Sequence, residues 1–265
     1  ELLDTWQPKE ESHGFGSTKE GLGRELGAAI KLKPDKFKDI PEKFKDSDPT
    51  YVRAFIQAFY ELAQNGYELN WSEMIELCSW VIQQPREIPG RLGEIMDQDP
   101  DWGWTRKSIS SLISRGTNSN SIPYELREKA WEIIEPSTHD PDPTPEDEAK
   151  HEEHSDDAYA HAINCSRGEA MNAVVEYALW VYRNVEESSE GKEKVKMGFE
   201  IMPEVKTVLE WHLDPSNDPS TAVRSIYGRF LPWLLLIDKK WTLENIKHIF
   251  PKGQFNDRLY GAAWN

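Results

Sequence analysis

Apolar side chains recur at three- and four-residue spacing in one segment of this chain after another, and an Asp-Pro pair precedes two of these segments. Such spacing places the apolar residues on one face of an α-helix. Asp accepts hydrogen bonds from the free N–H groups of a first helical turn, where proline has no N–H to leave unpaired. Asp48-Pro49 and Asp218-Pro219 are therefore predicted helix starts, and Asn65-Gly66 is a predicted helix end.

The pattern repeats along the whole chain. A second helix is expected from Asn70, as N-cap, to Pro85, and we expect it to form an antiparallel hairpin with the helix before it. Further helical patterns lie at about 19–31, 35–45, 104–115, 123–135, 167–187, 203–213, 220–230, 232–238 and 242–250. No segment shows sustained alternation of apolar and polar residues. The predicted fold is all-α without a β-sheet: an α-solenoid-like array of antiparallel helix pairs, similar to degenerate HEAT or TPR repeats.

Composition predicts the domain organisation. Residues 136–157 combine several prolines with dense acidic charge, so we expect an acidic, Pro-rich linker there. It would separate a helical lobe at 18–135 from a second lobe at 158–265, with an irregular segment at 1–17. Residues 186–196 are rich in Glu, Lys, Ser and Gly and are predicted to form a mobile loop. Because the chain starts at Glu1 and ends within a helical pattern, we expect it to be part of a longer protein.

Charge and cysteine usage limit the classes of partner. The formal net charge of -16 argues against nucleic acid, whose binding depends on Lys and Arg. Cys78 and Cys165 lie far apart in helical contexts, which indicates free thiols in a reducing compartment and favours a cytoplasmic location. No apolar run reaches membrane-spanning length and no signal peptide is present, so we expect no membrane contact. No cofactor is expected.

One cluster has residue types that bind metals. His151, His154, His161 and Cys165 lie close in sequence, and Asp157 falls between them. A zinc site needs three or four such ligands converging on one point. The spacing of His151 and His154 does not match a metallohydrolase helix of the His-Glu-x-x-His type. The preferred interpretation is a solvated acidic linker with incidental histidines, and a metal-binding domain or hydrolase is kept as the alternative function.

Five further residues are candidates for partner binding. Trp102 and Trp104 stand beside Arg106 at a predicted helix start, where they would form either an exposed contact site or a staple that packs the helix entry. Packing is the expected role. Arg167 and Arg224 lie in apolar helices, where each would pair with a buried carboxylate or face a ligand, and structural pairing is expected. Four other tryptophans are predicted to be core residues: Trp80, Trp131, Trp180 and Trp211.

Four phrases carry a family resemblance. They are DPDWGWTRKSISSLI at 99–113, IPYELREKAWEIIEPSTHDPDPTPEDE at 122–148, INCSRGEAMNAVVEYALWV at 163–181 and PSTAVRSIYGRFLPWLLLIDKKW at 219–241. Together they resemble the helical C-terminal regions of very large bacterial antiphage defence proteins. In those proteins an N-terminal effector, often with an ATPase of the STAND type, precedes a long helical sensor array. The resemblance covers most of residues 50–265.

What the resemblance implies is recognition of a protein, in particular a phage-encoded one, by a clamp-like array. The chain lacks the Walker motif of the ATPase, a GxSxG elbow and any other catalytic signature. We therefore expect a non-catalytic sensor or scaffold that binds a protein partner. A purely structural spacer or oligomerisation segment is the second alternative.

Overall fold

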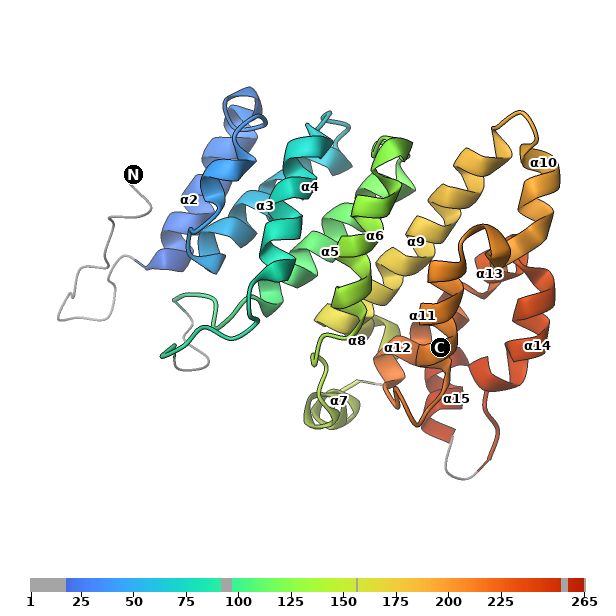
Figure 1. Cartoon of the computed structure of the whole chain (residues 1–265). Helices are drawn as coiled ribbons and strands as arrows, with labels where there is room; N and C mark the ends of the chain where they lie inside the picture. The colour runs from blue at the N-terminus through green and yellow to red at the C-terminus, as the bar shows by residue number, and fades with distance from the viewer. Residues whose placement is uncertain (1–17, 92–96, 156, 254–256, 265) are drawn as a thin grey trace. The chain divides into compact units, whose positions relative to one another are not determined.

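The computed structural model describes residues 18–91, 97–155, 157–253 and 257–264, and throughout these ranges all secondary structure is helical (Figure 1). The all-α prediction is confirmed, whereas the solenoid-like repeat remains a prediction. The chain divides into two compact units, residues 1–116 and 117–265. This boundary precedes the 136–157 segment, at which the sequence predicts the division between lobes.

Unit 1 contains four α-helices and two short 3₁₀ turns among its described residues. They are α2 (Lys19–Leu32), η1 (Pro34–Lys36), η2 (Pro41–Phe44), α3 (Pro49–Gln64), α4 (Trp71–Gln83) and most of α5 (Gly103–Asn118). The expected helix at 35–45 is thus replaced by the two 3₁₀ turns. In the core of the unit, the ring of Phe55 lies between those of Phe44 and Phe59, tilted to both, with ring centroids 4.1 and 4.9 Å apart.

The starts of α3 and α4 show how local sequence sets helix boundaries. Asp48 caps α3 as predicted, and its carboxylate accepts a hydrogen bond from the Thr50 backbone N–H at 3.1 Å. Gly66, which follows the C-cap of α3, adopts a positive φ of 82° that favours glycine. Asn70 occupies the N-cap position of α4, but its side chain donates to Asp39 at 3.0 Å and leaves the cap unmade.

Unit 2 is built around one long helix. Its elements, in chain order, are η3 (Tyr124–Leu126), α6 (Arg127–Thr138), α7 (Pro145–Glu152), α8 (Ala158–Ala162), α9 (Ser166–Glu186), α10 (Gly191–Lys194), η4 (Val195–Ile201), α11 (Pro203–Leu213), α12 (Thr221–Arg229), α13 (Leu231–Ile237), α14 (Lys239–Ile249) and α15 (Asp257–Trp264). Helix α9 packs against α6, α8, α12 and α13 and is buried over most of its length. Because its neighbours cover most of its length, α9 forms the centre of the core of unit 2.

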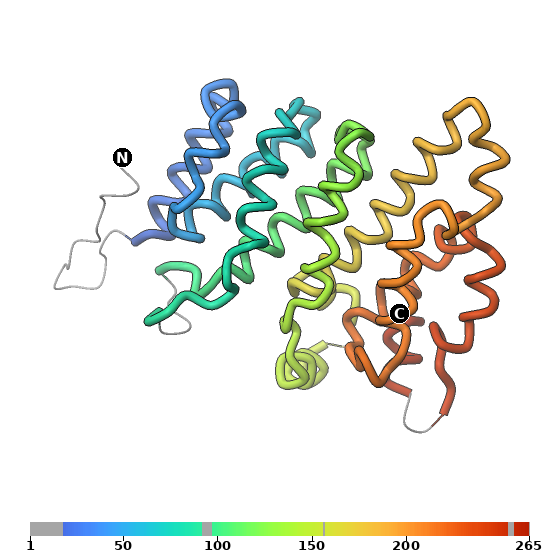
Figure 2. The backbone as a smooth tube through the Cα atoms, viewed as in Figure 1, coloured from blue at the N-terminus to red at the C-terminus, as the bar shows by residue number. Residues whose placement is uncertain are grey.

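Two expected irregular segments contain helices. Within 136–157, α6 continues through Pro136, and α7 forms with a capping box in which Thr144 and Asp147 bind each other's backbone N–H. Proline fits the first position of a helix, so Pro145 promotes α7. The prediction of an extended linker is therefore wrong over these residues. Within 186–196, α10 turns back along the end of α9 (Figure 2).

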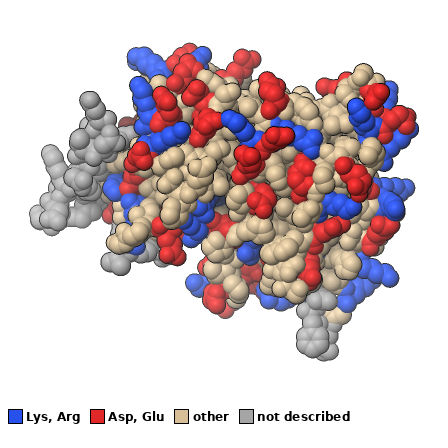
Figure 3. Space-filling model, in the orientation of Figure 1, with Lys and Arg blue, Asp and Glu red and all other residues tan. Residues whose placement is uncertain are grey.

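The tryptophans divide between core and surface. Trp180 is fully buried on α9, in contact with Tyr124 and Tyr177. Trp211, expected in the core, is 40% exposed and packs its ring edge-on against His139. Acidic and basic side chains are interspersed over the face drawn in Figure 3. No described helix combines the length and the apolar character needed to cross a bilayer.

Candidate functional site

The predicted partner-binding residues of unit 1 have three different environments. Trp102 is 7% exposed and meets Trp80 edge to face, with ring centroids 5.5 Å apart. It therefore has the packing role and is corrected as a surface candidate. Arg106 donates to the backbone carbonyls of Gln84 at 2.7 Å and Ile82 at 3.4 Å, at the C-terminal end of α4. Its guanidinium anchors the C-terminal end of helix α4 and does not project toward a partner.

Trp104 is the one of the three that remains on the surface, with 48% of its side chain exposed. It stands in the first turn of α5, and the guanidinium of Arg53 on α3 lies 5.7 Å from its ring centre. This distance is within the range of a cation–π contact. One side of the indole is thus covered by a cation, and much of the rest is open to solvent.

Arg53 is held in place by two carboxylates. Its Nε and Nη2 donate to Asp99 at 2.8 and 2.9 Å, and its Nη2 also donates to Glu20 at 2.5 Å. Asp99 is completely buried, and its backbone N–H donates to the Thr50 hydroxyl. Although burial by itself favours the neutral form of Arg53, the two carboxylates raise its pKa, so it remains a cation. Forked pairing of this kind fixes the orientation of the guanidinium.

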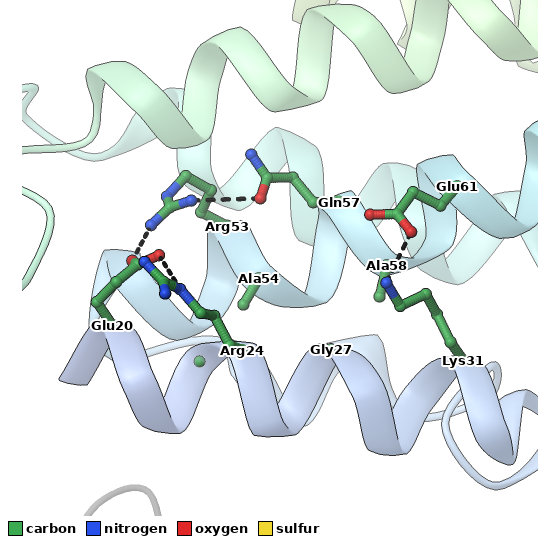
Figure 4. A pocket seen from close by; sticks show the side chains of 10 residues that line it. Glu20, Arg24, Gly27, Lys31, Arg53, Ala54, Gln57, Ala58 and Glu61 are labelled. Carbon is green, nitrogen blue, oxygen red and sulfur yellow. Dashed lines mark hydrogen bonds and ion pairs between the residues drawn. The ribbon is translucent and has the colours of Figure 1, made fainter. Parts of the chain in front are cut away.

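A cleft of about 170 Å³ lies next to this cation, between α2 and α3 (Figure 4). Its charged rim includes Glu20, Arg24, Lys31 and Glu61, and Lys31 donates to Glu61 at 2.7 Å. Small residues line it as well: Gly23, Gly27, Ala54 and Ala58. These small residues let the two helices approach closely. Its charges largely pair with one another, and Arg53 both lines the cleft and contacts Trp104.

Arg167 and Arg224, the candidates of unit 2, both serve internal contacts. Arg167 donates to the carbonyls of Asp140 and Pro143 at 3.2 and 3.0 Å, and its Nε lies 3.5 Å from Asp218. Arg224 is 1% exposed and donates to the carbonyl of Leu213 at 2.9 Å and to that of His248 at 2.5 Å. Burial lowers the pKa of Arg224. Both guanidinium groups bind backbone carbonyls inside unit 2, so both residues are corrected as partner-binding candidates.

The four candidate metal ligands do not converge. The rings of His151 and His161 stack 4.4 Å apart, while His154 uses Nδ1 for a 2.8 Å contact with the Lys150 carbonyl. Cys165 is buried, its thiol donates to the Ala162 carbonyl, and burial raises its pKa to about 12. Among the residues that the structure describes, no group of three or more His, Cys, Asp or Glu side chains could hold a metal ion. The geometry thus gives no support to the metal alternative.

The structure contains a buried polar cluster that sequence reasoning missed. His212 on α11 is fully buried, and its Nδ1 lies 2.6 Å from the carboxylate of Asp218. Asp218 also accepts from the Ser220 N–H, while Ser220 caps α12 in its place. Burial lowers the pKa of His212 despite the carboxylate. The local sequence predicts Asp218 as a helix start, and nothing in it signals the pairing with a histidine.

This cluster has the composition of a catalytic dyad but not its geometry. Nε2 of His212 is buried and has no hydrogen-bond partner among the described residues. A general base must reach the proton that it removes from a substrate, and a fully buried imidazole cannot. The pair joins α11 to the start of α12.

Trp104 is thus the predicted site residue of unit 1 that stays at the surface, and the structure adds the Arg53 network and the cleft that Arg53 lines. No protein-family model, curated protein or solved structure matches the chain.

Proposed function

We propose that this chain recognises a protein partner and that the face of unit 1 around Trp104 is part of its binding surface. The observation that carries the proposal is a half-exposed tryptophan fixed against an arginine whose own charge is already paired. Tryptophan and arginine are the residue types most enriched at the energetic centres of protein interfaces. A cytoplasmic location, in keeping with the two free and buried cysteines, is part of the same proposal.

Preorganisation supports this role. An exposed aromatic that must be ordered on binding loses part of its contact energy to side-chain entropy, at about 0.5–1.5 kcal/mol for each immobilised side chain. Here Arg53 and the buried Asp99 hold one face of the indole in advance. The cleft between α2 and α3 gives a partner an adjacent depression in which a side chain can lodge.

The resemblance to helical sensor arrays leads us to propose that the partner is a phage-encoded protein. The test is to immobilise the chain, expose it to lysates of phage-infected and uninfected cells, and identify proteins enriched from the infected lysate. Each enriched phage protein is then purified and its affinity for the chain is measured. Recovery of no phage protein, with a phage against which the protein protects its cell, would refute the sensor function.

The contribution of the proposed surface is tested with the purified partner. Trp104→Ala is expected to weaken binding about 30-fold, which corresponds to roughly 2 kcal/mol and is the lower limit for a hot-spot residue. Trp264→Ala is the matched control, since it removes an even more exposed tryptophan from unit 2. Equal effects of the two substitutions, or none from Trp104→Ala, would mean that binding uses another face.

A further inference from the structure

Helix α13 leaves an apolar face uncovered. Its inner side is buried through Leu234 and Ile237, whereas Trp233 and Leu236 on the other side are 48% and 50% exposed. These two residues are three positions apart and therefore lie side by side on the helix surface. Exposed side chains of this size, grouped on one face, mark interaction sites more often than isolated ones do.

Helix α14 continues this surface with a leucine surrounded by lysines. Leu243 is 52% exposed, and Lys239, Lys240 and Lys247 occupy the positions four before, three before and four after it. On a helix these are its nearest neighbours. Lys239 and Lys247 form no ion pair with any described residue, and Lys240 only approaches Glu244 at 4.0 Å, with both side chains largely exposed.

The acidic residue between the two helices does not neutralise these lysines. Asp238 turns its carboxylate toward the protein, where it accepts from the backbone N–H groups of Phe199 at 3.1 Å and Trp241 at 2.9 Å. It caps α14 and ties it to η4. The outer surface thus keeps the lysine charges, although the protein as a whole has a formal net charge of -16.

The apolar and basic residues come from two consecutive helices that a single residue, Asp238, joins. Leu236 and Lys239 are three residues apart, so their Cα atoms lie within roughly 11 Å, and α13 and α14 pack against each other. In Figure 1 the two helices are consecutive elements in the C-terminal part of unit 2. We call Trp233, Leu236, Lys239, Lys240, Leu243 and Lys247 the α13–α14 face.

We infer that the α13–α14 face binds an acidic amphipathic helix of a partner protein. Such a helix presents apolar side chains at three- and four-residue spacing, which match Trp233, Leu236 and Leu243, and its flanking carboxylates match the lysines. A second copy of this chain fits less well, since symmetric pairing of the face would bring its lysines together. Binding of an anionic membrane through the same lysines is distinguished from this by the vesicle measurement below.

This inference is independent of the Trp104 surface and is tested without its partner. The probe is a fluorescein-labelled peptide, roughly five helical turns long, with Leu at helical spacing and Glu at most other positions. Fluorescence anisotropy measures its binding to the whole chain. Binding is expected for this peptide and not for one in which Lys replaces every Glu or Ser replaces every Leu. Raising salt from about 50 mM to about 300 mM is expected to weaken it through screening.

Charge reversal locates the binding site. Lys239→Glu/Lys247→Glu is expected to weaken peptide binding about tenfold, because two attractive contacts become repulsive. The matched control, Lys33→Glu/Lys36→Glu, makes the same change of charge at exposed lysines of unit 1 and is expected to leave binding unchanged. Both double variants alter only exposed side chains, and circular dichroism checks that each remains helical.

Four results would overturn the inference. The first is that the acidic peptide does not bind, and the second is that the two double variants bind it equally well. The third is that the chain self-associates in sedimentation velocity and that Lys239→Glu/Lys247→Glu abolishes this self-association. The fourth is that vesicles containing phosphatidylserine bind the chain through these lysines while the peptide does not bind. Because none of these measurements involves Trp104, failure here leaves the proposed function untouched, and the reverse also holds.

Discussion

Helices α12 and α15 of unit 2 pack closely at one glycine and leave another glycine open. Replacing each of the two by alanine is expected to change the stability of the unit in opposite directions. Gly228 on α12 faces the backbone of α15, and a Cβ built on it would overlap the carbonyl oxygen of Ala263. The same Cβ would lie 2.5 Å from the carbonyl carbon and 2.9 Å from Cα of that residue. Gly261, on α15 itself, has nothing within 4 Å of its Cβ position. We therefore expect Gly228→Ala to destabilise unit 2 and Gly261→Ala to stabilise it.

The magnitude follows from what must move. The obstacle at Gly228 is backbone, which cannot rotate away, so α12 and α15 must separate by about 1 Å or more, a gap that forfeits up to half of each dispersion contact along the interface. Overpacking costs about 1–3 kcal/mol, and we expect the upper end here. Alanine has a better helix propensity than glycine, and this offsets about 1 kcal/mol of the cost. The expected net loss at Gly228 is thus about 2 kcal/mol, against a gain of roughly 0.5–1 kcal/mol at Gly261.

Urea unfolding of the whole chain, followed by far-UV circular dichroism, measures both effects. With a slope of about 2 kcal/mol per molar urea, Gly228→Ala should lower the midpoint of the unit 2 transition by about 1 M, and Gly261→Ala should raise it by a few tenths. The slope itself should not change. If Gly228→Ala is as stable as the parent chain, or if the two substitutions have the same sign, the close contact of α12 and α15 is refuted.

Three further outcomes are expected. Because burial lowers the pKa of His212 below the ordinary 6.5, the unfolded chain binds a proton more readily than the folded one, so the melting temperature should fall from about pH 7.5 to about pH 5.5. His212→Gln should reduce that fall, and a rise in melting temperature on acidification would contradict the buried neutral histidine. Burial raises the pKa of both Cys78 and Cys165 to about 12. A disulfide reagent should therefore label neither thiol in the native chain and both thiols in urea. Rapid labelling of the folded protein would show that a thiol is accessible. Zinc should not raise the melting temperature, since the histidines of 151–165 do not converge, and a stoichiometric metal in elemental analysis of the purified protein would show that they do.

Local sequence predicted the helices well because most of their signals act within one or two turns. Asp48 caps α3 through a contact with a residue two positions away, and the stripe of α3 is buried as its spacing indicates. The wrong prediction of an extended linker came from the average composition of a segment. Residues 136–157 are rich in proline and acid, yet Thr144, Pro145 and Asp147 supply a complete helix start within that stretch. A capping box is a specific arrangement of a few residues, and average polarity conceals it.

The candidate sites depended on contacts between distant residues, and there sequence reasoning was weak. Trp102 and Trp104 stand two positions apart with similar neighbours, but Trp80 buries one and Arg53 flanks the other. No pattern around Arg224 shows that two helix-end carbonyls will occupy its guanidinium. Helix spacing alone places the lysines next to Leu243. Whether their charge stays available to a partner depends on the Asp238 carboxylate, which points toward the protein and binds backbone N–H groups there.

The sequence by itself therefore determined that this chain is all-α and where most of its helices begin and end, because helix periodicity, caps and proline positions are interactions between near neighbours. Only the tertiary structure decided which tryptophans reach the surface, which arginines are occupied and which helix faces remain uncovered. Those outcomes depend on the direction in which each face points and on what packs against it. Residues such as Arg53 and Asp99, or Glu148 and Ser220, meet across long stretches of chain whose path no local signal records.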